Sequence, residues 1–292
     1  MKHLFVLLAM LLCLPGGAQQ VSSPQPSQKD GERQALLMVH FGTTFDDSRQ
    51  KTIDVINDKA RLAFPQMKVA EAYASRTVMK RLAEKGIRKD TPTDALLRLR
   101  ADGYRHVTVQ PTFIIDGREM EQLRREIDQL RPFFDTIVVG TPLLYTTADC
   151  QRVCNVLVDR HPIATSKKGK GVDQHVVFVG HGTRGPATAL YSQLDYMLHA
   201  NGHPNYHVST IEGYPTLRTV TAQLKAQHAK SVTLVPLLFV AGDHATNDIA
   251  VEWKEALEQA GFKVNVVVEG LGEVPGIQNL YIEKIQEDTK LE

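Results

Sequence analysis

The chain has 292 residues, of which 42% are hydrophobic and 23% are charged, and its formal net charge is +1. This composition is typical of a globular protein and excludes a mostly disordered chain, a collagen-like repeat and a disulfide scaffold. The near-zero charge argues against a protein that binds nucleic acid through a basic surface. The length predicts two domains of roughly 130 residues each.

The N-terminus has the parts of a secretory signal peptide. A cation near the start precedes an apolar run over 4–14, and small residues follow at Gly16 and Ala18. The run is too short to cross a bilayer, which takes about 20 apolar residues. We therefore predict a cleavable signal peptide over 1–18, export to the periplasm and no stable membrane anchor. Residues 19–33 are rich in Gln, Ser and Pro and are predicted to be a flexible linker.

The rest of the chain alternates strand patterns with helix patterns. Short apolar runs are typical of strands buried on both faces, and helical segments of about 10–15 residues separate them. This alternation predicts parallel sheets with helices on both faces. The expected strands are 35–39, 67–73, 105–111, 135–139, 175–179, 206–211, 231–236 and 263–268. The expected helices are 47–63, 76–86, 92–101, 119–130, 148–160, 186–200, 215–228, 246–260 and 275–287.

A polar, glycine-rich stretch over 166–171 divides the pattern into two halves. We interpret this stretch as an interdomain linker. The sequence therefore predicts an N-terminal α/β lobe over 34–165 and a C-terminal α/β lobe over 172–292. Each lobe is expected to hold a parallel sheet flanked by helices, with a cleft between the two.

Histidine and glutamate residues have the same spacing in the two halves. From His40 to Glu71 is 31 positions, and from His181 to Glu212 is also 31. Glycine-bearing turns are common to all parallel βα units, but such turns do not explain matched His and Glu residues. We interpret the spacing as the trace of a duplication that produced two similar lobes.

A second match follows the third strand of each half. Pro111 precedes Glu119 by eight positions, and Pro236 precedes His244 by eight. Sites in parallel α/β sheets form outside the carboxyl ends of the strands. The matched His and Glu residues lie at or just after such ends, so we expect them on the facing rims of one cleft.

His181, Glu212 and His244 form a ligand set suited to a first-row divalent metal. Imidazole suits Co, Fe, Ni and Zn, and a carboxylate adds charge and an oxygen donor. A lone histidine at a strand end is more often a satisfied polar residue. Three such residues at the ends of different strands favour a metal site, with open coordination positions for a substrate.

The other polar residues carry weaker signals. His40 is interpreted as a cleft residue and His106 as an exposed residue at a strand start. Six histidines are predicted to lie at the surface: His161, His175, His199, His203, His207 and His228. Five arginines near the predicted rim are candidates to pair with substrate carboxylates, although solvation at the surface explains any single one equally well: Arg49, Arg76, Arg118, Arg184 and Arg218.

Four segments carry a resemblance to a known family. Residues 38–44 (Met-Val-His-Phe-Gly-Thr-Thr), 179–183 (Val-Gly-His-Gly-Thr), 211–215 (Ile-Glu-Gly-Tyr-Pro) and 236–248, which ends in Ala-Gly-Asp-His-Ala-Thr-Asn-Asp, resemble the anaerobic cobalt chelatases. These are the CbiK-type sirohydrochlorin cobaltochelatases, which resemble the class II chelatases. The similarity runs from about residue 34 to the C-terminus.

The resemblance implies two α/β lobes that hold a tetrapyrrole between them. It implies insertion of Co²⁺ into sirohydrochlorin for cobalamin biosynthesis, without ATP or a second subunit, and Fe²⁺ suits the same ligands. The metal ligands it implies are His181, Glu212 and His244, and the catalytic residues are His181 and Glu119, with Glu119 facing from the other lobe as a proton acceptor. No cofactor is required, because the metal is a substrate, and bound haem is left open.

Three functions stay open at this point. The complete His and Glu set favours an exported metallochelatase, whereas the export signal favours a periplasmic carrier of metal or of a tetrapyrrole such as haem. A two-lobed solute-binding protein would explain export and the cleft, but not the matched His and Glu residues. The expected partner is a tetrapyrrole and not nucleic acid, and exposed apolar helical faces predict a homo-oligomer.

Overall fold

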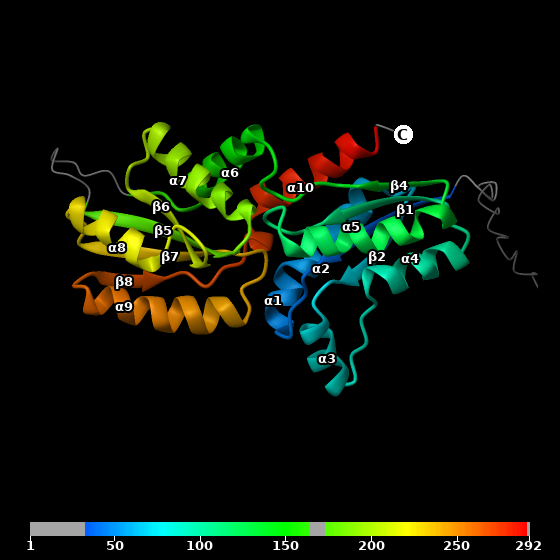
Figure 1. The fold of residues 1–292 in the computed structure, drawn as a ribbon, viewed down its shortest axis with the longest axis horizontal. Helices are drawn as coiled ribbons and strands as arrows, with labels where there is room; N and C mark the ends of the chain where they lie inside the picture. Colours follow the sequence, from blue (N-terminus) through cyan, green and yellow to red (C-terminus); the bar gives the residue numbers. More distant parts are fainter. Residues whose placement is uncertain (1–32, 164–172, 291–292) are drawn as a thin grey trace, which may run out of the picture.

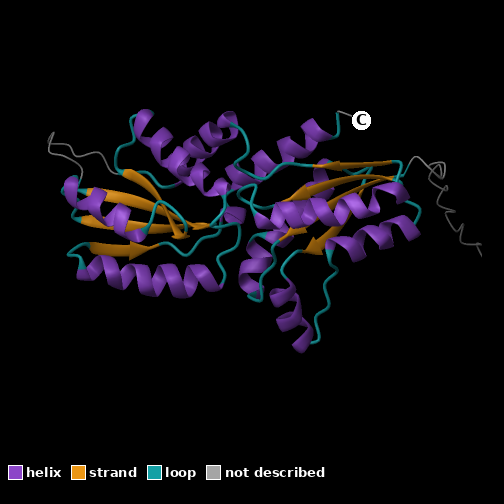
Figure 2. Ribbon diagram, viewed as in Figure 1, coloured by secondary structure: helices purple, strands orange, loops and turns teal. Residues whose placement is uncertain are grey.

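A computed structural model describes residues 33–163 and 173–290. The predicted signal peptide and interdomain linker lie outside the described residues, as does all of the flexible linker except Arg33. Two four-stranded parallel sheets lie side by side (Figure 1). Helices cover both faces of each sheet (Figure 2), so the predicted two-lobed α/β fold is confirmed. No helix in these described ranges is both long and apolar enough to cross a membrane.

The first lobe has the strand order β2-β1-β3-β4. Its strands are β1 (Gln34–His40), β2 (Lys68–Tyr73), β3 (His106–Pro111) and β4 (Thr136–Val139). The helices in this part of the chain are α1 (Asp46–Lys51), α2 (Ile53–Ala63), α3 (Arg76–Glu84), α4 (Pro92–Ala101), α5 (Arg118–Leu130), the 3₁₀ helix η1 (Arg131–Phe133) and α6 (Thr147–Arg160).

The second lobe repeats this order as β6-β5-β7-β8. Its strands are β5 (Gln174–Gly182), β6 (Tyr206–Glu212), β7 (Ser231–Leu237) and β8 (Lys263–Val266). Its helices are η2 (Pro186–Thr188), α7 (Ala189–Ala200), α8 (Leu217–Ala226), the π-helix η3 (His244–Trp253), α9 (Lys254–Gln259), η4 (Leu271–Glu273) and α10 (Pro275–Asp288).

The strand register identifies equivalent residues in the two lobes. Val39 pairs with Pro111 between β1 and β3, and Val179 pairs with Pro236 between β5 and β7. Each valine lies on the first strand of its lobe and each proline on the third. Val39 is therefore equivalent to Val179, and the duplication inferred from the matched prolines agrees with the register.

The interval of 31 residues does not mark equivalent residues, and that part of the interpretation is wrong. His40 directly follows Val39, so its counterpart is Gly180 and not His181. Glu71 pairs with the residue two before His40, whereas Glu212 pairs with the residue after His181. Because side chains alternate between the two faces of a sheet, a shift of one residue sends the side chain to the opposite face.

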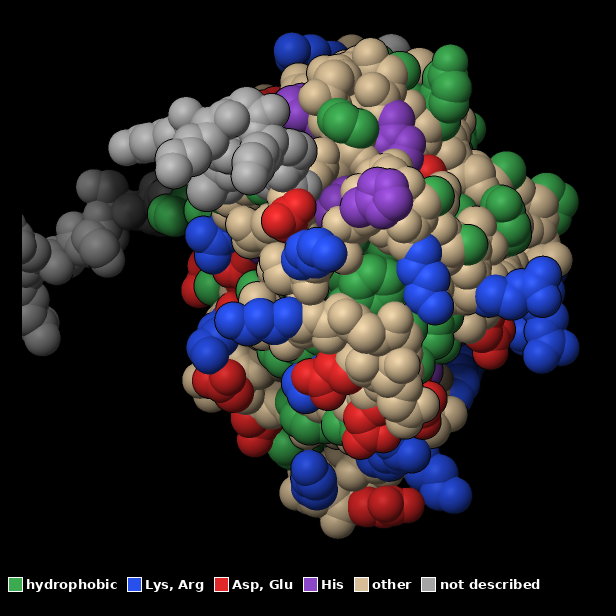
Figure 3. All heavy atoms as spheres, turned by 90° about the vertical axis from the view of Figure 1, so that its left-hand side faces the viewer, with side chains coloured by type: hydrophobic (Ala, Val, Ile, Leu, Met, Phe, Trp, Pro, Cys, Tyr) green, Lys and Arg blue, Asp and Glu red, His purple; other side chains and the backbone are tan. Residues whose placement is uncertain are grey.

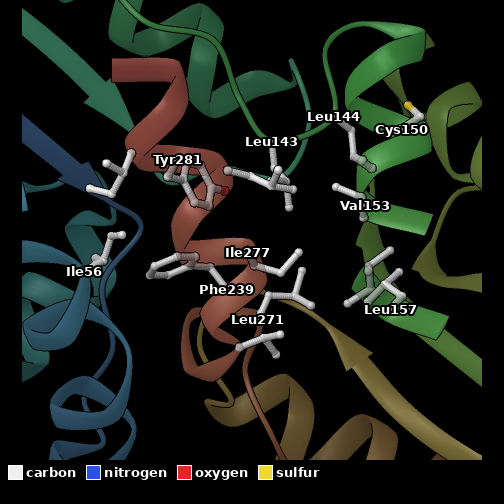
Figure 4. Packing of buried hydrophobic residues seen from close by; sticks show 14 of the residues in the cluster. Ile56, Leu143, Leu144, Cys150, Val153, Leu157, Phe239, Leu271, Ile277 and Tyr281 are labelled. Carbon is white, nitrogen blue, oxygen red and sulfur yellow. The ribbon is translucent and has the colours of Figure 1, made fainter. Parts of the chain in front are cut away.

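One hydrophobic core joins the two lobes. Leu36 on β1 and Phe178 on β5 belong to the same buried cluster. Residues of α10, such as Ile277 and Tyr281, lie in this cluster between Ile56 on α2 and the side chains of α6 (Figure 4). The outer faces of the sheets have cores of their own, under α4 and α5 in the first lobe and under α8, η3 and α9 in the second.

Two helices connect the lobes across this core. α6 follows the first sheet in sequence but lies beside α7 of the second lobe, whereas α10 ends the chain and packs on the first lobe (Figure 1). Tyr281 donates a hydrogen bond to the carbonyl of Phe113 (3.0 Å). The Lys284 ammonium lies 2.9 Å from the Asp149 carboxylate, and these residues are 6% and 8% exposed. A buried ion pair therefore joins α10 to the first turn of α6.

Candidate metal centre

The structure brings together His181, the next-to-last residue of β5, and His244, which follows β7. Their ring centroids are 4.7 Å apart, and the rings are nearly perpendicular. His181 Nδ1–H donates to the carbonyl of Gly182 (3.1 Å), and His244 Nδ1 lies 2.6 Å from Asp248 Oδ2. Each ring is oriented through Nδ1, which leaves Nε2 as the donor for a ligand. Metal-binding histidines are commonly oriented in this way.

The residues around His244 form hydrogen bonds across single helical turns. Asn247 donates to Asp243 (2.7 Å), and His244 is paired with Asp248, each over an interval of four residues. These pairs lie at the start of η3, and π-helical turns occur frequently at functional sites. Asp248 was not among the residues predicted for the site. Its spacing from His244 is the signal that would have identified it as the residue that orients this ring.

Two glycines determine how closely the chain packs around His181. A Cβ on Gly180 would lie 2.2 Å from the Tyr191 ring, and a Cβ on Gly182 would lie 1.5 Å from the carbonyl oxygen of Glu212. Gly182 also has a φ of +78°, which L-residues rarely adopt. The Gly-His-Gly sequence thus allows an aromatic ring and the end of β6 to approach the backbone of His181.

Glu212 is the least constrained of the three predicted ligands. The backbone of Glu212, at the end of β6, pairs with Gly182, and Glu212 is exposed. Within the described residues, the donor atoms of His181, His244 and Glu212 do not form a group in which all lie within 4.8 Å of one another. The structure therefore brings the two imidazoles together and leaves the Glu212 carboxylate outside the pair.

Glu119 approaches this centre from the first lobe. It lies exposed in the first turn of α5. Burial, and to a smaller extent the charge of Glu119, raise the pKa of Tyr191 to about 12. The Tyr191 hydroxyl accepts a hydrogen bond from the backbone N–H of Gly182, beside His181. The charge of Glu119 thus acts on Tyr191, a neighbour of the His181 turn.

His40 is not a cleft residue, and that prediction is wrong. It is fully buried on the inner face of the first sheet, with Nδ1 2.9 Å from Thr112 Oγ1. His40 Nε2–H donates to Asn57 (3.0 Å), whose amide donates to Glu71 (2.7 Å). Glu71 in turn pairs with Lys89 (2.6 Å). His40 and Glu71 therefore belong to an internal polar network of the first lobe, and burial lowers the pKa of His40.

The prediction of surface positions is also wrong for two of the six histidines. His175 and His207 are 1% and 0% exposed, and they lie near the beginnings of the neighbouring strands β5 and β6. His175 Nδ1 and His207 Nε2 are 2.9 Å apart. His228 is exposed, and the other three of the six are partly buried.

Two of the five arginines near the predicted rim have acidic partners within the protein. Arg49 pairs with Asp54, and Arg76 lies 3.9 Å from Glu126. Three others are exposed and form no ion pair with any described residue: Arg118, Arg184 and Arg218. These three remain the candidates for binding an anionic ligand.

Comparison with known proteins places the chain among metal chelatases. Residues 34–290 match the family described as cobalt chelatase (CbiK). A sirohydrochlorin cobaltochelatase of Salmonella typhimurium strain LT2 is 34% identical over 255 residues, which cover 86% of this chain and 94% of that protein. The sirohydrochlorin cobaltochelatase CbiKC of Nitratidesulfovibrio vulgaris strain Hildenborough is 31% identical over 259 residues, which cover 87% and 89%.

Solved structures share the fold at low sequence identity. SirB from Bacillus subtilis with Fe³⁺ has a TM-score of 0.61 and 14% identity over 88% of this chain and 95% of that chain. The sirohydrochlorin chelatase SirB from Bacillus subtilis subspecies spizizenii in complex with cobalt has a TM-score of 0.58 and 13% identity over 88% and 96%. The chain belongs to the cobalt chelatase (CbiK) family and has the two-lobed α/β fold of the chelatases.

Proposed function

We propose that this chain is a sirohydrochlorin cobaltochelatase, which inserts Co²⁺, or Fe²⁺, into the tetrapyrrole for cobalamin biosynthesis without ATP. One observation carries the proposal. In a chain that matches the family over residues 34–290, His181 and His244 face each other with ring centroids 4.7 Å apart. Their Nδ1 atoms are held by Gly182 and Asp248, so both Nε2 atoms are available to one metal ion.

The substrate metal would be held by His181, His244 and Glu212. Two imidazoles and a carboxylate suit Co²⁺ and Fe²⁺. The Glu212 side chain is exposed, and its carboxylate would have to turn toward the rings to complete the site. Three protein ligands leave coordination positions open, and transfer of the metal to the pyrrole nitrogens requires such positions.

Insertion also requires the removal of two protons from pyrrole nitrogens. Glu119 belongs to the first lobe, and its charge acts on Tyr191, which contacts the turn that carries His181. We assign Glu119 as a proton acceptor. His181 serves first as a metal ligand and, after the metal has moved to the ring, as a second acceptor, because neutral imidazole can do both. Arg118, Arg184 and Arg218 would bind the carboxylates of the tetrapyrrole.

An anaerobic optical assay with purified protein, sirohydrochlorin and Co²⁺ or Fe²⁺ tests the proposal. We expect conversion to the metallated product with wild-type protein, and only the enzyme-free rate with His181→Ala or His244→Ala. The matched control is His203→Ala, which removes an imidazole in the loop between α7 and β6, beside Tyr206. Wild-type turnover in the His244→Ala variant would refute the ligand assignment.

A periplasmic carrier of metal or tetrapyrrole is the second candidate, and the predicted signal peptide favours it. Tight binding of either ligand by wild-type protein, without accelerated insertion, would establish the carrier. Export is a separate part of the proposal. Fractionation of cells that make the full chain, followed by N-terminal sequencing, should find mature protein in the periplasm with a new terminus close to Ala18. Full-length protein confined to the cytoplasm would contradict export.

A further inference from the structure

A second cluster of metal-ligating side chains lies in the second lobe, away from His181. One donor atom each from Asp195, His199 and His207 lies within 4.8 Å of the other two. Within the ranges that the structure describes, no other group of three His, Cys, Asp or Glu residues has this geometry. Figure 3 looks onto the outer end of the second lobe and shows several histidine side chains gathered there.

The fold brings the three residues together through one helix and one strand. Asp195 and His199 are four positions apart on α7, so their side chains lie on the same face of the helix. His207 is the second residue of β6, and α7 packs on this strand. The site therefore depends on the contact between α7 and β6.

Hydrogen bonds orient two of the three side chains. Asp195 Oδ1 accepts a hydrogen bond from the backbone N–H of Val208 (2.8 Å), and His199 Nε2–H donates to the carbonyl of Tyr206 (2.9 Å). The Asp195 carboxylate also accepts a hydrogen bond from the Gln223 side chain on α8, so a metal ion would share it with these donors. Nδ1 of His199 is left as a donor atom. Because Val208 and Tyr206 flank His207 on β6, both bonds hold the α7 side chains against the strand that carries the third residue.

His207 supplies an independent sign of a ligand. His207 is 0% exposed, and its Nδ1 atom is buried without a hydrogen-bond partner. Buried polar atoms without partners are rare, and each calls for an explanation such as an ion. Burial, and then the neighbouring His175 and His199, lower the pKa of His207 to about 3, so the ring is neutral at pH 7.

We propose that Asp195, His199 and His207 bind one first-row divalent metal ion, such as Zn²⁺ or Co²⁺, as a resident ion of the second lobe. Two imidazoles and one carboxylate are a common ligand set for these metals and leave a fourth position for water.

His175 orients the ligand without touching the ion. With the metal on Nδ1 of His207, the Nε2–H of that ring donates to His175 Nδ1 at 2.9 Å. His175 then carries its own proton on Nε2, which faces the side-chain amide of Asn205 at 3.3 Å. Asn205 Nδ2 also donates to the carbonyl of Gln174 (3.1 Å), so metal binding requires that this amide move away from His175 Nε2–H.

This site is separate from the proposed insertion site. His207 and Glu212 are five residues apart along β6, which corresponds to about 16 Å in an extended strand. The ion would join α7 to β6 at the opposite end of the sheet from His181. The inference therefore does not depend on the proposed chelatase activity.

Metal titration of a variant without the insertion site tests the proposal. In the His181→Ala/His244→Ala protein, freed of metal by a chelator, we expect Zn²⁺ to bind at one ion per chain by calorimetry. Co²⁺ should give the visible absorption of a four-coordinate site. Adding His199→Gln or Asp195→Asn should weaken the affinity at least tenfold. His203→Ala is the matched control and should leave the affinity unchanged.

The two added substitutions are chosen to preserve the fold. Gln at position 199 keeps an N–H donor for the Tyr206 carbonyl but lacks an aromatic nitrogen, and Asn at position 195 keeps an oxygen for Val208 N–H. Unchanged melting temperatures of the metal-free variants would confirm that only the donors were lost. The proposal is overturned if the His181→Ala/His244→Ala protein binds no metal, or if both added substitutions leave its affinity unchanged.

Discussion

Near the end of the first strand of each lobe, equivalent positions hold a glycine with positive φ. These glycines are Gly42, with a φ of +97°, and Gly182, with a φ of +78°. The residue before the glycine is Phe41 in the first lobe, where it is 44% exposed, and His181 in the second. Equivalent positions therefore hold an apolar ring in one lobe and, in the proposed function, a metal-binding imidazole in the other.

At the position before Phe41 and His181, the histidine is in the first lobe instead of the second. The first lobe has a buried histidine, His40, where the second has Gly180, which leaves room for the Tyr191 ring. Eight residues after the equivalent prolines, the first lobe has Glu119 and the second has His244. In the proposed mechanism the second lobe supplies the metal-binding imidazoles and the first supplies the facing carboxylate. Duplication thus explains the shared architecture, and differences at single positions give the two lobes different functional side chains.

The largest expected effect is at the two equivalent turn positions. His181→Ala should reduce metal insertion to the enzyme-free rate, because it removes a metal ligand. Phe41→Ala should leave kcat within a few-fold of wild type and raise KM, because Phe41 offers only apolar contact to a bound ring. Steady-state assays of both variants test this difference. An equal loss of kcat in the two would mean that the lobes are not functionally distinct.

The ion pair between Lys284 and Asp149 tests whether the lobes share one core. Burial opposes ionisation of Asp149, but hydrogen bonds from Lys284 and Thr146 hold its pKa below the ordinary value. Lys284→Ala leaves this buried carboxylate without its charged partner and should lower the free energy of unfolding by about 3 kcal/mol. Urea denaturation measures the change.

The control for this prediction is Lys254→Ala, which removes an exposed ion pair with Glu258 on α9. We expect it to cost at most about 0.5 kcal/mol. Equal effects of the two substitutions, or separate unfolding of the two lobes in the wild-type protein, would contradict a shared core.

The buried His40 predicts a pH dependence specific to the first lobe. Burial lowers its pKa in the folded state, so below about pH 6.5 the unfolded chain binds a proton that the native state does not. Stability should therefore fall as the pH falls, by up to about 1.4 kcal/mol per pH unit from this group. His40→Gln removes the titrating group but can still hydrogen-bond to Asn57.

Unfolding free energies at two pH values check this prediction. The slope between pH 6.5 and 5.5 should be smaller in His40→Gln than in wild type, while the exposed His228→Asn leaves it unchanged. An unchanged slope in His40→Gln would show that the loss of stability in acid comes from other groups, such as His175 and His207.

The smallest expected effects concern the unpaired arginines, one from each lobe. Arg118→Ala and Arg184→Ala should each raise KM for sirohydrochlorin about two- to fivefold, with kcat unchanged, because an exposed charge pair contributes about 0.5–1 kcal/mol. Added salt should reduce both effects. Arg61→Ala, which removes an exposed partner of Asp58 on α2, is the control. An effect from only one lobe would mean that the carboxylates are bound asymmetrically.

Local sequence patterns predicted the helices and strands closely. Each expected strand agrees with an observed strand to within two or three residues. Three expected helices proved more complex. The segment 47–63 is interrupted at Thr52, 186–200 begins with the 3₁₀ helix η2, and 246–260 consists of a π-helix followed by α9. Hydrophobic periodicity indicates which face of a helix is buried. It does not reveal a local break in a helix or a change from α-helical to π-helical hydrogen bonding.

The proposed site was predicted in part. His181 and His244 follow strands whose carboxyl ends meet, and topology alone brings them near each other. The same reasoning failed for His40. It lies one residue earlier along its strand than the position equivalent to His181, so its side chain points into the interior and not toward the rim. The reasoning also missed the cluster of Asp195, His199 and His207, since that cluster lies at the opposite end of the sheet from the expected site.

The sequence by itself determined the alternation of strands and helices, the glycine turns and the motifs of the chelatase family, because each of these depends on residues close together in the chain. Tertiary structure decided which histidines are buried, and it placed α6 beside the second lobe and α10 on the first. Those outcomes depend on side chains from distant segments that fill one shared interior. Their packing is a property of the whole fold and has no local signature.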